Sequence, residues 1–475
     1  MPRFTAHRAF FALAGGQLVS TLGSGMTRFG LGLWVLSDEV GGSAADYTTM
    51  LFAAILPLGI ASLFVGPLID RWNRRLVMIL ANAGASAPTI IVAVLYFSDA
   101  LEIWHLYIAL IANGVASAFI LPALDASTPM LMPQDQLGRA AGVTQMLQSF
   151  EIILAPVLAV PLFLGLGLGA VFVVDFVTFG ISIIVLGLSV IPQPVRVLQE
   201  AGQSVWAEFR FGVRYIKERP PFIMLIFFVS MSMLIMPGIG YALATPLSLA
   251  ISDEAGAAAV LTCFGVGSLV AGVLLAAWGG PARRMNGILG AMVLAGVGGV
   301  ITGVSESLVV TAAGVFIIGA SFVFAIGLNR VIWQVKAAPE VLGRVFALRV
   351  LIGVVAQSTG IIAAGPLADG VFEPLLIEGG ALAGSIGEII GVGEGRGMGL
   401  MYIIAGLTLA AFALVSLIVR PIWRLEDALP DQPSQVASEA ESQPSQEVQQ
   451  TQQAQDLIAR AAPISEGASD DQAGH

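Results

Sequence analysis

The residues of this chain that could do chemistry are the few polar and charged ones inside its long apolar stretches. A charged side chain is costly in hydrocarbon, so one that is retained there usually marks an ion pair or a path for a substrate or a proton. Arg28 ends a stripe of polar residues spaced three to four positions apart, which places them on one face of a helix. The other members of this stripe, all candidates to line a substrate cavity, are Gln17, Ser20, Thr21 and Ser24.

Glu151 ends a second polar stripe, which also contains the candidate cavity residues Gln145 and Gln148. We take Glu151 as the leading candidate for a proton-binding group, because burial favours the neutral form of a carboxylic acid and brings its proton exchange toward neutral pH. Arg28 joins it as a proton-coupling candidate. Two alternatives stay open for Glu151: a fixed structural pair with Arg28, and a position on a water-filled wall.

Four further polar residues lie in apolar stretches. Asp125 is another candidate for proton coupling, whereas Asp175 is expected to be a structural partner. Asn113 and Gln357 extend the set of candidate cavity residues. The acidic and basic groups that could couple transport to protons therefore concentrate in the first half of the chain.

The composition places these residues among membrane-spanning helices, because 56% of the residues are hydrophobic and only 11% are charged. A helix needs about 20 mostly apolar residues to cross a bilayer, and the apolar runs here are too long and uniform for barrel strands. The predicted fold is an all-α integral membrane protein with about twelve transmembrane helices. The expected spans are residues 10–36, 47–69, 76–97, 104–126, 141–165, 168–191, 222–250, 257–278, 286–304, 307–329, 345–370 and 399–420.

The distribution of basic residues predicts the orientation. When the N-terminus is placed in the cytoplasm, 20 of the 22 Lys and Arg residues fall on the cytoplasmic side, and the exceptions are Arg28 and Arg396. Loops that carry basic residues resist translocation, so both ends of the chain are expected in the cytoplasm. The formal net charge of -10 comes from acidic outer loops and the C-terminal tail.

Three short motifs recur in the second half of the chain at an offset of 205 to 210 residues. The recurring pairs are Arg74-Arg75 with Arg283-Arg284, Leu137-Gly138-Arg139 with Leu342-Gly343-Arg344, and Ala155-Pro156 with Gly365-Pro366. Each half then holds six helices, an even number, so both halves face the same way across the membrane. The sequence therefore predicts two parallel six-helix repeats.

The expected domains follow from this repeat. They are a six-helix bundle over residues 1–191, a cytoplasmic linker over 192–221, a second six-helix bundle over 222–420 and a disordered cytoplasmic tail over 421–475. The linker interleaves aromatic with basic residues, which fits a short helix on the membrane surface or a solvated connection. The tail is rich in Gln, Ser, Glu and Ala and has no apolar periodicity, which predicts disorder.

The stretch from Gly66 to Arg75 has the pattern GxxxDRxxRR and lies between the second and third predicted spans. It resembles the signature cytoplasmic loop of the major facilitator superfamily, and with the duplication and the basic linker the resemblance covers residues 8–420. Gly16–Ser24, Pro122-Ala123, Pro133 and Leu137–Arg139 are more narrowly similar to the macrolide-efflux and siderophore-exporter branch of drug:proton antiporters. The resemblance implies that predicted spans one and five border a central cavity, where both polar stripes meet water and substrate.

Five residues of this loop are candidates for gating. In the superfamily the aspartate stabilises the outward-facing closure between the halves, which the resemblance implies for Asp70. Asp70 can meet the positive N-terminal end of a neighbouring helix, and Gly66 lets helices approach closely. Arg71, Arg74 and Arg75 can pair with carboxylates or lipid phosphate. The second copy of the motif lacks the aspartate, so a symmetric latch there is not expected.

The sequence contains no motif for ATP hydrolysis, metal binding or enzyme catalysis. The chain has no GxxxxGK[ST] phosphate loop, so ATP hydrolysis is not expected. Cys263 is a lone cysteine in an apolar stretch, and His7, His105 and His475 lie at membrane edges or in the tail, so no metal site is proposed. No nucleophile and base stand out at membrane depth, and we expect neither enzyme activity, nor a cofactor, nor a nucleic-acid partner.

These observations predict a secondary active exporter of a bacterial inner membrane that works by alternating access and proton antiport. The expected partners are protons, membrane lipid and a bulky amphipathic small molecule such as a drug, a macrolide or a siderophore, and the expected form is a monomer. Two alternatives stay open. One is an uncoupled facilitator or importer of a metabolite or lipid, and the other is a non-transporting membrane sensor or scaffold.

Overall fold

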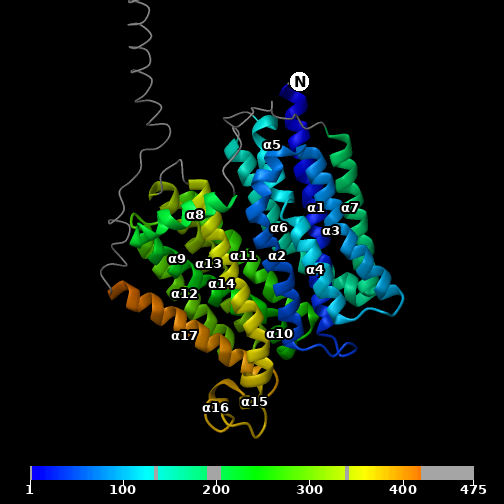
Figure 1. Cartoon of the computed structure of the whole chain (residues 1–475). Helices are drawn as coiled ribbons and strands as arrows, with labels where there is room; N and C mark the ends of the chain where they lie inside the picture. Colours follow the sequence, from blue (N-terminus) through cyan, green and yellow to red (C-terminus); the bar gives the residue numbers. More distant parts are fainter. Residues whose placement is uncertain (1–2, 133–136, 190–204, 337–341, 419–475) are drawn as a thin grey trace, which may run out of the picture.

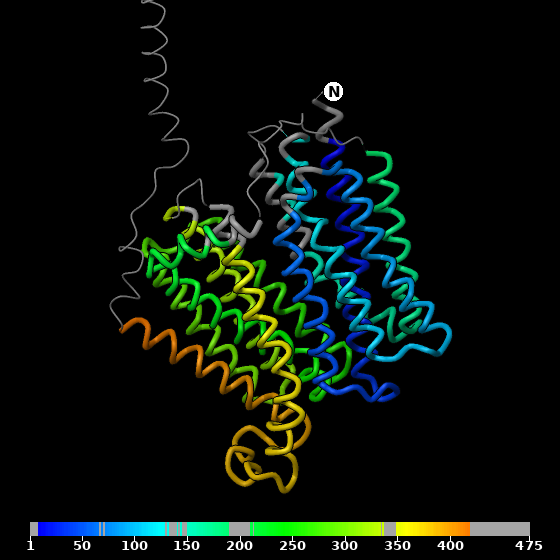
Figure 2. The backbone as a smooth tube through the Cα atoms, viewed as in Figure 1, coloured from blue at the N-terminus to red at the C-terminus, as the bar shows by residue number. Residues whose placement is uncertain are grey.

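The computed structural model describes residues 3–132, 137–189, 205–336 and 342–418. In these ranges every regular element is a helix, and the long helices form two bundles that lie side by side (Figure 1, Figure 2). The predicted all-α membrane fold is confirmed. The predicted tail and the first part of the predicted linker, residues 192–204, lie outside the described residues.

The first bundle is built from the blue to cyan-green helices of Figure 1. Its second helix begins at a capping box, in which Asp46 accepts a hydrogen bond from the Ser43 backbone N–H at 2.9 Å and Ser43 accepts one from the Asp46 backbone N–H at 3.2 Å. The next helix starts after Asn73, whose side chain accepts from the backbone N–H of Leu76. The elements are α1 (Arg3–Val35), α2 (Ala44–Arg71), α3 (Arg74–Phe97), α4 (Ile103–Ser117), α5 (Ile120–Leu131), α6 (Leu137–Leu166) and α7 (Leu168–Leu188).

The second bundle follows α8 (Val205–Lys217), a short helix inside the predicted linker. Its first span is made of α9 (Pro220–Met233), the π-helical turn η2 (Leu234–Gly240) and α10 (Tyr241–Ile251). Pro237 lies inside this turn, where its missing N–H breaks the regular helical hydrogen bonds. The remaining elements are α11 (Glu254–Trp278), α12 (Arg284–Val304), α13 (Leu308–Lys336), α14 (Leu342–Leu367), η4 (Ala368–Phe372), α15 (Glu373–Leu376), α16 (Gly387–Ile390) and α17 (Arg396–Ile418).

Ten helical segments in the described ranges are long and apolar enough to cross a membrane. They match ten of the twelve predicted spans, and the other two predicted spans fall on α1 and α6. α1 carries the polar stripe that ends at Arg28, and the apolar part of α6 is the shorter segment Phe150–Leu166. The number of spans is compatible with twelve. Large apolar side chains such as Leu80, Val94 and Ile184 are exposed on the bundle surfaces, as contact with lipid requires.

The same pairs of helices pack in both bundles. In the first bundle α2 packs on α4, and α3 packs on both α4 and α7; in the second, α11 packs on α13, and α12 packs on both α13 and α17. Between the bundles, α2 packs on α14 and α6 packs on α11. If the twelve spans are numbered in chain order, α2 is span two, α14 is span eleven, α6 is span five and α11 is span eight. Spans two and eight occupy equivalent places in the two halves, and so do spans five and eleven. The packing therefore repeats with the six-span period that the sequence predicts.

We call the end of the molecule where α2 begins and α14 ends the outer end, and the end where α2 ends and α3 begins the inner end. The named contacts between the bundles run from the outer end to the middle of the helices. They include Gly59 with Val354 in the middle of the α2–α14 pair, and Gly265 with Ile152 and Ile153 in the α6–α11 pair. The two bundles are closed against each other over this part of their length.

Candidate functional site

Arg28 on α1 and Glu151 on α6 form an ion pair in which the guanidinium donates to the Glu151 carboxylate. Their side chains keep 41% and 20% of their surface exposed, although both lie in the middle of long helices. A charged pair at this depth that still reaches solvent-accessible space is the arrangement expected of a polar site between the bundles. The structure thus brings together the two leading coupling candidates, and the proton-binding role of Glu151 stays a prediction.

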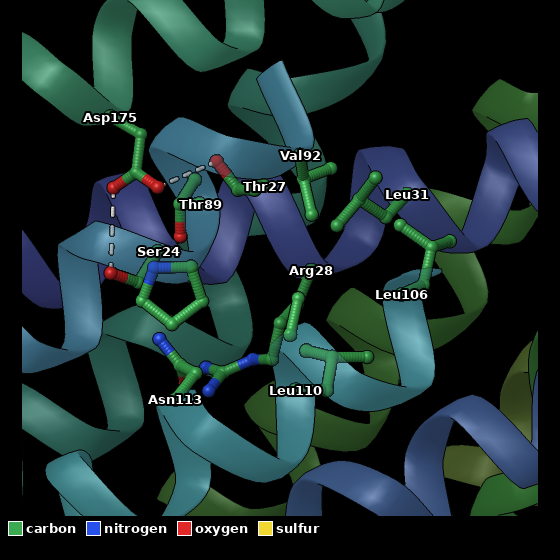
Figure 3. Close-up of a pocket in the computed structure, with 12 residues that line it drawn as sticks. Ser24, Thr27, Arg28, Leu31, Thr89, Val92, Leu106, Leu110, Asn113 and Asp175 are labelled. Atoms are coloured by element: carbon green, nitrogen blue, oxygen red, sulfur yellow. Dashed lines mark hydrogen bonds between the residues drawn. The ribbon is translucent and has the colours of Figure 1, made fainter. Parts of the chain in front are cut away.

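Asp175 on α7 lies on the other side of α1 and is fully buried. Thr27 donates a hydrogen bond to its Oδ2 atom at 2.8 Å, and Ser24 donates to its Oδ1 atom at 3.4 Å. Figure 3 shows both hydroxyls directed at the carboxylate from one helix of the first bundle. The predicted structural role of Asp175 therefore has partners on α1, and its carboxylate is held at membrane depth by neutral groups.

A small cavity inside the first bundle is lined by both Arg28 and Asp175. It has a volume of about 30 Å³, which is room for about two water molecules. Asn113 on α4 belongs to its wall and donates to the Ala85 carbonyl of α3 at 2.8 Å, and the Arg28 side chain extends toward Asn113 (Figure 3). The polar lining consists of Ser24, Thr27, Arg28, Thr89, Asn113 and Asp175.

The other predicted cavity residues are more scattered. Gln17 and Ser20 are buried at 5% and 2% exposure, and Thr21 donates to the Gln17 carbonyl at 2.6 Å. The part of the α1 stripe nearer the start of the helix therefore packs against protein. Asp125 is exposed on α5, and Gln357 is half-buried on α14. The side chains of Gln145 and Gln148 lie outside the described residues.

At the outer end the two bundles meet through polar contacts that the sequence did not predict. Asp369 in η4, which directly follows α14, accepts a hydrogen bond from the Ala45 backbone N–H at 2.8 Å. Tyr47 on α2 donates to the Thr245 hydroxyl of α10 at 3.0 Å, and the pair is buried. Gly365 lies directly against α2, where a Cβ atom would collide with Thr48 and the Ala45 backbone. No sequence signal joins these residues, because they are far apart in the chain.

At the inner end the two arginines that begin α3 anchor the first bundle. Arg74 donates to the Ala126 carbonyl of α5 at 2.5 Å. Arg75 donates through Nε to the Leu186 carbonyl of α7 at 3.1 Å, and its guanidinium also donates to the Gly187 carbonyl. The Arg75 contacts satisfy two carbonyls in the last turn of α7, and the Arg74 contact joins the start of α3 to the middle of α5. The side chains of the other gating candidates, Gly66, Asp70 and Arg71, lie outside the described residues.

The chain matches the family model described as Major Facilitator Superfamily over residues 13–361. The chain belongs to the major facilitator superfamily. It is therefore a multi-pass membrane transporter, and the family resemblance seen in the loop from Gly66 to Arg75 is confirmed.

Relatives and solved structures agree with this assignment. Macrolide efflux protein A of Streptococcus pyogenes is 27% identical over 383 residues, which cover 78% of this chain and 92% of that protein. The protein of the same name from Enterococcus faecalis is 28% identical over 319 residues, covering 64% and 95%. A bacterial homologue of the human lysosomal transporter Spinster, in an inward-facing and occupied conformation, superposes with a TM-score of 0.64 at 14% identity, over 89% of this chain and 97% of that one. The nucleoside transporter NupG gives 0.60 at 13% identity, over 86% and 98%.

α6 takes part in two contacts, one with α1 inside the first bundle and one with α11 of the second bundle. The closure between bundles uses α2 with α14 and α6 with α11, so α6 contributes both to this contact and to the ion pair with Arg28. A movement of one bundle against the other would therefore act on the element that carries Glu151. α6 therefore connects the Arg28–Glu151 pair to the contact between the two bundles.

Proposed function

We propose that this superfamily member is a proton-coupled exporter of a bulky amphipathic small molecule. The observation that carries the proposal is the Arg28–Glu151 pair, because its two charged side chains lie at membrane depth and are partly exposed. A charged group of residues in that position is in reach of water and can take part in the proton exchange of each cycle.

The class of substrate follows from similarity and composition. Relatives that match over more than nine tenths of their length are named macrolide efflux proteins. The helices around the site supply mostly apolar side chains with scattered polar groups, which suits a solute with a large apolar surface and a few polar atoms. We propose a drug, a macrolide or a siderophore as the transported molecule, and export as the direction.

The movement is alternating access between two closures, and the described contacts support a state closed at the outer end. Asp369 extends from η4, which directly follows α14, to the first turn of α2. Asp70 belongs to the last turn of α2, and α14 begins at Leu342, so in this antiparallel pair the end of α2 and the start of α14 are both at the inner end. We propose that the outer contact through Asp369 and an inner contact through Asp70 form alternately, because each carboxylate is stabilised by a helix N-terminus.

The placement in the cell rests on the distribution of basic residues. We propose a bacterial inner membrane with both chain ends in the cytoplasm and the inner end of the bundles facing the cytoplasm. Export then requires that the state closed at the outer end take up substrate from the cytoplasm and release protons there.

Transport in proteoliposomes tests the function. With a pH gradient and tritiated erythromycin as the probe, the wild type should accumulate the macrolide against its gradient. Glu151→Gln should lose this uphill transport and keep downhill exchange of labelled for unlabelled macrolide, because exchange needs no net proton movement. The exposed Glu388→Gln on α16 is the matched control and should behave as wild type.

Three outcomes would contradict the proposal in different ways. Downhill flux that ignores the pH gradient in the wild type would indicate the uncoupled facilitator. Binding without any flux, over a panel of macrolides and siderophores, would favour the sensor or scaffold. Near wild-type accumulation by Glu151→Gln would show that coupling does not need the Arg28–Glu151 pair.

A further inference from the structure

The carboxylate of Asp175 is enclosed between two helices. α1 packs on α7 at Gly23, where a Cβ atom would collide with Thr178 and lie 2.8 Å from Asp175 Oδ1. This close approach leaves the carboxylate fully buried, with the hydroxyls of Thr27 and Ser24 as its hydrogen-bond donors in the part of the chain that the structure describes. A hydroxyl can donate to a carboxylate and can also accept from a carboxylic acid, so this setting accommodates both protonation states.

The charged groups that face Asp175 are few. From α1 comes Arg28, which interacts with it electrostatically while holding the ion pair with Glu151 of α6. α3 and α4 contribute the uncharged Thr89 and Asn113 to the shared cavity. One guanidinium therefore stands between two carboxylates. When all three groups are ionised they carry one net negative charge, and one added proton makes the group neutral.

We propose that Asp175 is the carboxylate that carries the transported proton, while Glu151 stays paired with Arg28. This inference rests on the proposed function, and it names the residue of that site at which the proton is bound. Glu151 has a cation in direct contact, which stabilises its charged form. Asp175 has hydroxyls in direct contact, so adding a proton there breaks no ion pair.

The proton reaches Asp175 from water and returns to water. The cavity beside it has room for about two water molecules and is bounded by Arg28, whose side chain is 41% exposed. Water in this cavity can pass a proton between the solvent-accessible ion pair and the buried carboxylate. When the proton leaves, Arg28 then balances two carboxylates instead of one, which changes the force between α1, α6 and α7.

The experiment compares two carboxylate variants in proteoliposomes loaded with erythromycin. Asp175→Asn keeps the size and hydrogen-bonding capacity of the protonated acid. Exchange of labelled erythromycin should persist in this variant and become independent of pH between pH 5.5 and 8.5. Glu151→Gln should keep a pH-dependent exchange rate, with its midpoint shifted to lower pH, because the freed Arg28 then stabilises ionised Asp175.

If Asp175→Asn fails to fold, two variants that lack a hydroxyl group test whether Asp175 binds the proton. Thr27→Val removes a donor to the ionised carboxylate and should raise the pH midpoint of exchange by about one unit. Thr178→Val is the matched control, since its hydroxyl bonds the Asp175 backbone carbonyl and not the carboxylate, and it should leave the midpoint in place.

The results separate this inference from the proposed function. If the wild type shows no pH-driven accumulation, the proposed function itself fails. If the wild type is coupled and Asp175→Asn remains pH-dependent with normal accumulation, only the assignment of the proton to Asp175 is wrong. An unchanged midpoint in Thr27→Val would overturn the assignment as well.

Discussion

Asp369 and Ala45 are separated by 324 positions in the chain, and the carboxylate of the first accepts a hydrogen bond from the backbone N–H of the second at 2.8 Å. Ala45 lies in the first turn of α2, whose local cap is already supplied by Ser43 and Asp46. The N-terminus of α2 thus has one cap from its own bundle and one from the other. Only the second cap must break when the outer end opens.

Removing the charge of Asp369 should favour the state that is open at the outer end. Asp369→Asn weakens a contact between a carboxylate and a helix N-terminus, worth about 0.3 to 2 kcal/mol. A change of 1.4 kcal/mol shifts a two-state ratio about tenfold. A cysteine at Ala258, buried on α11 among residues of both bundles, should then react up to about tenfold faster with an impermeant maleimide added outside. The background is Cys263→Ala.

The variant Asp70→Asn is the control, because it should change the labelling rate in the opposite direction. It should slow the labelling of the cysteine at position 258, because it weakens the inner closure and leaves the outer closure intact. Glu388→Gln, an exposed charge of the outer loop, should not change the rate. Equal rates in all four proteins would show that neither aspartate holds a closure.

Adding a single methyl group at Gly365 should prevent the outer end from closing. The Cβ atom of Gly365→Ala would overlap Thr48 and the Ala45 backbone, and overpacking of this kind costs about 1 to 3 kcal/mol. We expect transport to fall by about fivefold or more, with expression and detergent stability close to wild type. Gly370→Ala is the matched control, because a Cβ atom there meets open space. Normal transport by Gly365→Ala would mean that the outer closure can relax.

Cysteine labelling in whole cells tests the orientation. Glu378 and Asn73 are both exposed and lie at the outer and inner ends respectively. In the Cys263→Ala background, Glu378→Cys should react with an impermeant thiol reagent added outside, and Asn73→Cys should react only after the cells are permeabilised. The reverse pattern would invert the proposed topology and the proposed direction of transport.

The fold could be predicted from the sequence because lipid imposes a strong pattern on it. A span must be apolar over about 20 residues whatever its neighbours are, so the expected stretches coincide with long helices. The ion pair between Arg28 and Glu151 was among the alternatives because charged residues are rare at membrane depth. The helical spacing of the α1 stripe also led to Ser24, which contacts Asp175.

Contacts between distant parts of the chain could not be predicted in the same way. Asp369 was not among the candidate site residues, because nothing in the sequence indicates that the end of α14 lies beside the start of α2. Arg396 was an exception to the distribution of basic residues. In the structure it is buried at 1% exposure, donates to the Ile390 carbonyl at 3.0 Å and lies 3.9 Å from Glu306, so it fixes the outer loop to α17.

If Asp175 carries one proton in each cycle, the number of protons exchanged for each substrate sets a thermodynamic ceiling on accumulation. If one proton is exchanged per cycle for a substrate that carries one positive charge, no net charge crosses the membrane, and each unit of pH difference supports at most about a tenfold concentration ratio. For a neutral substrate the same proton also moves one charge, and 100 mV of membrane potential adds about 2.3 kcal/mol, or roughly fiftyfold. The protonation state of the substrate then determines whether the voltage of the cell contributes to its removal.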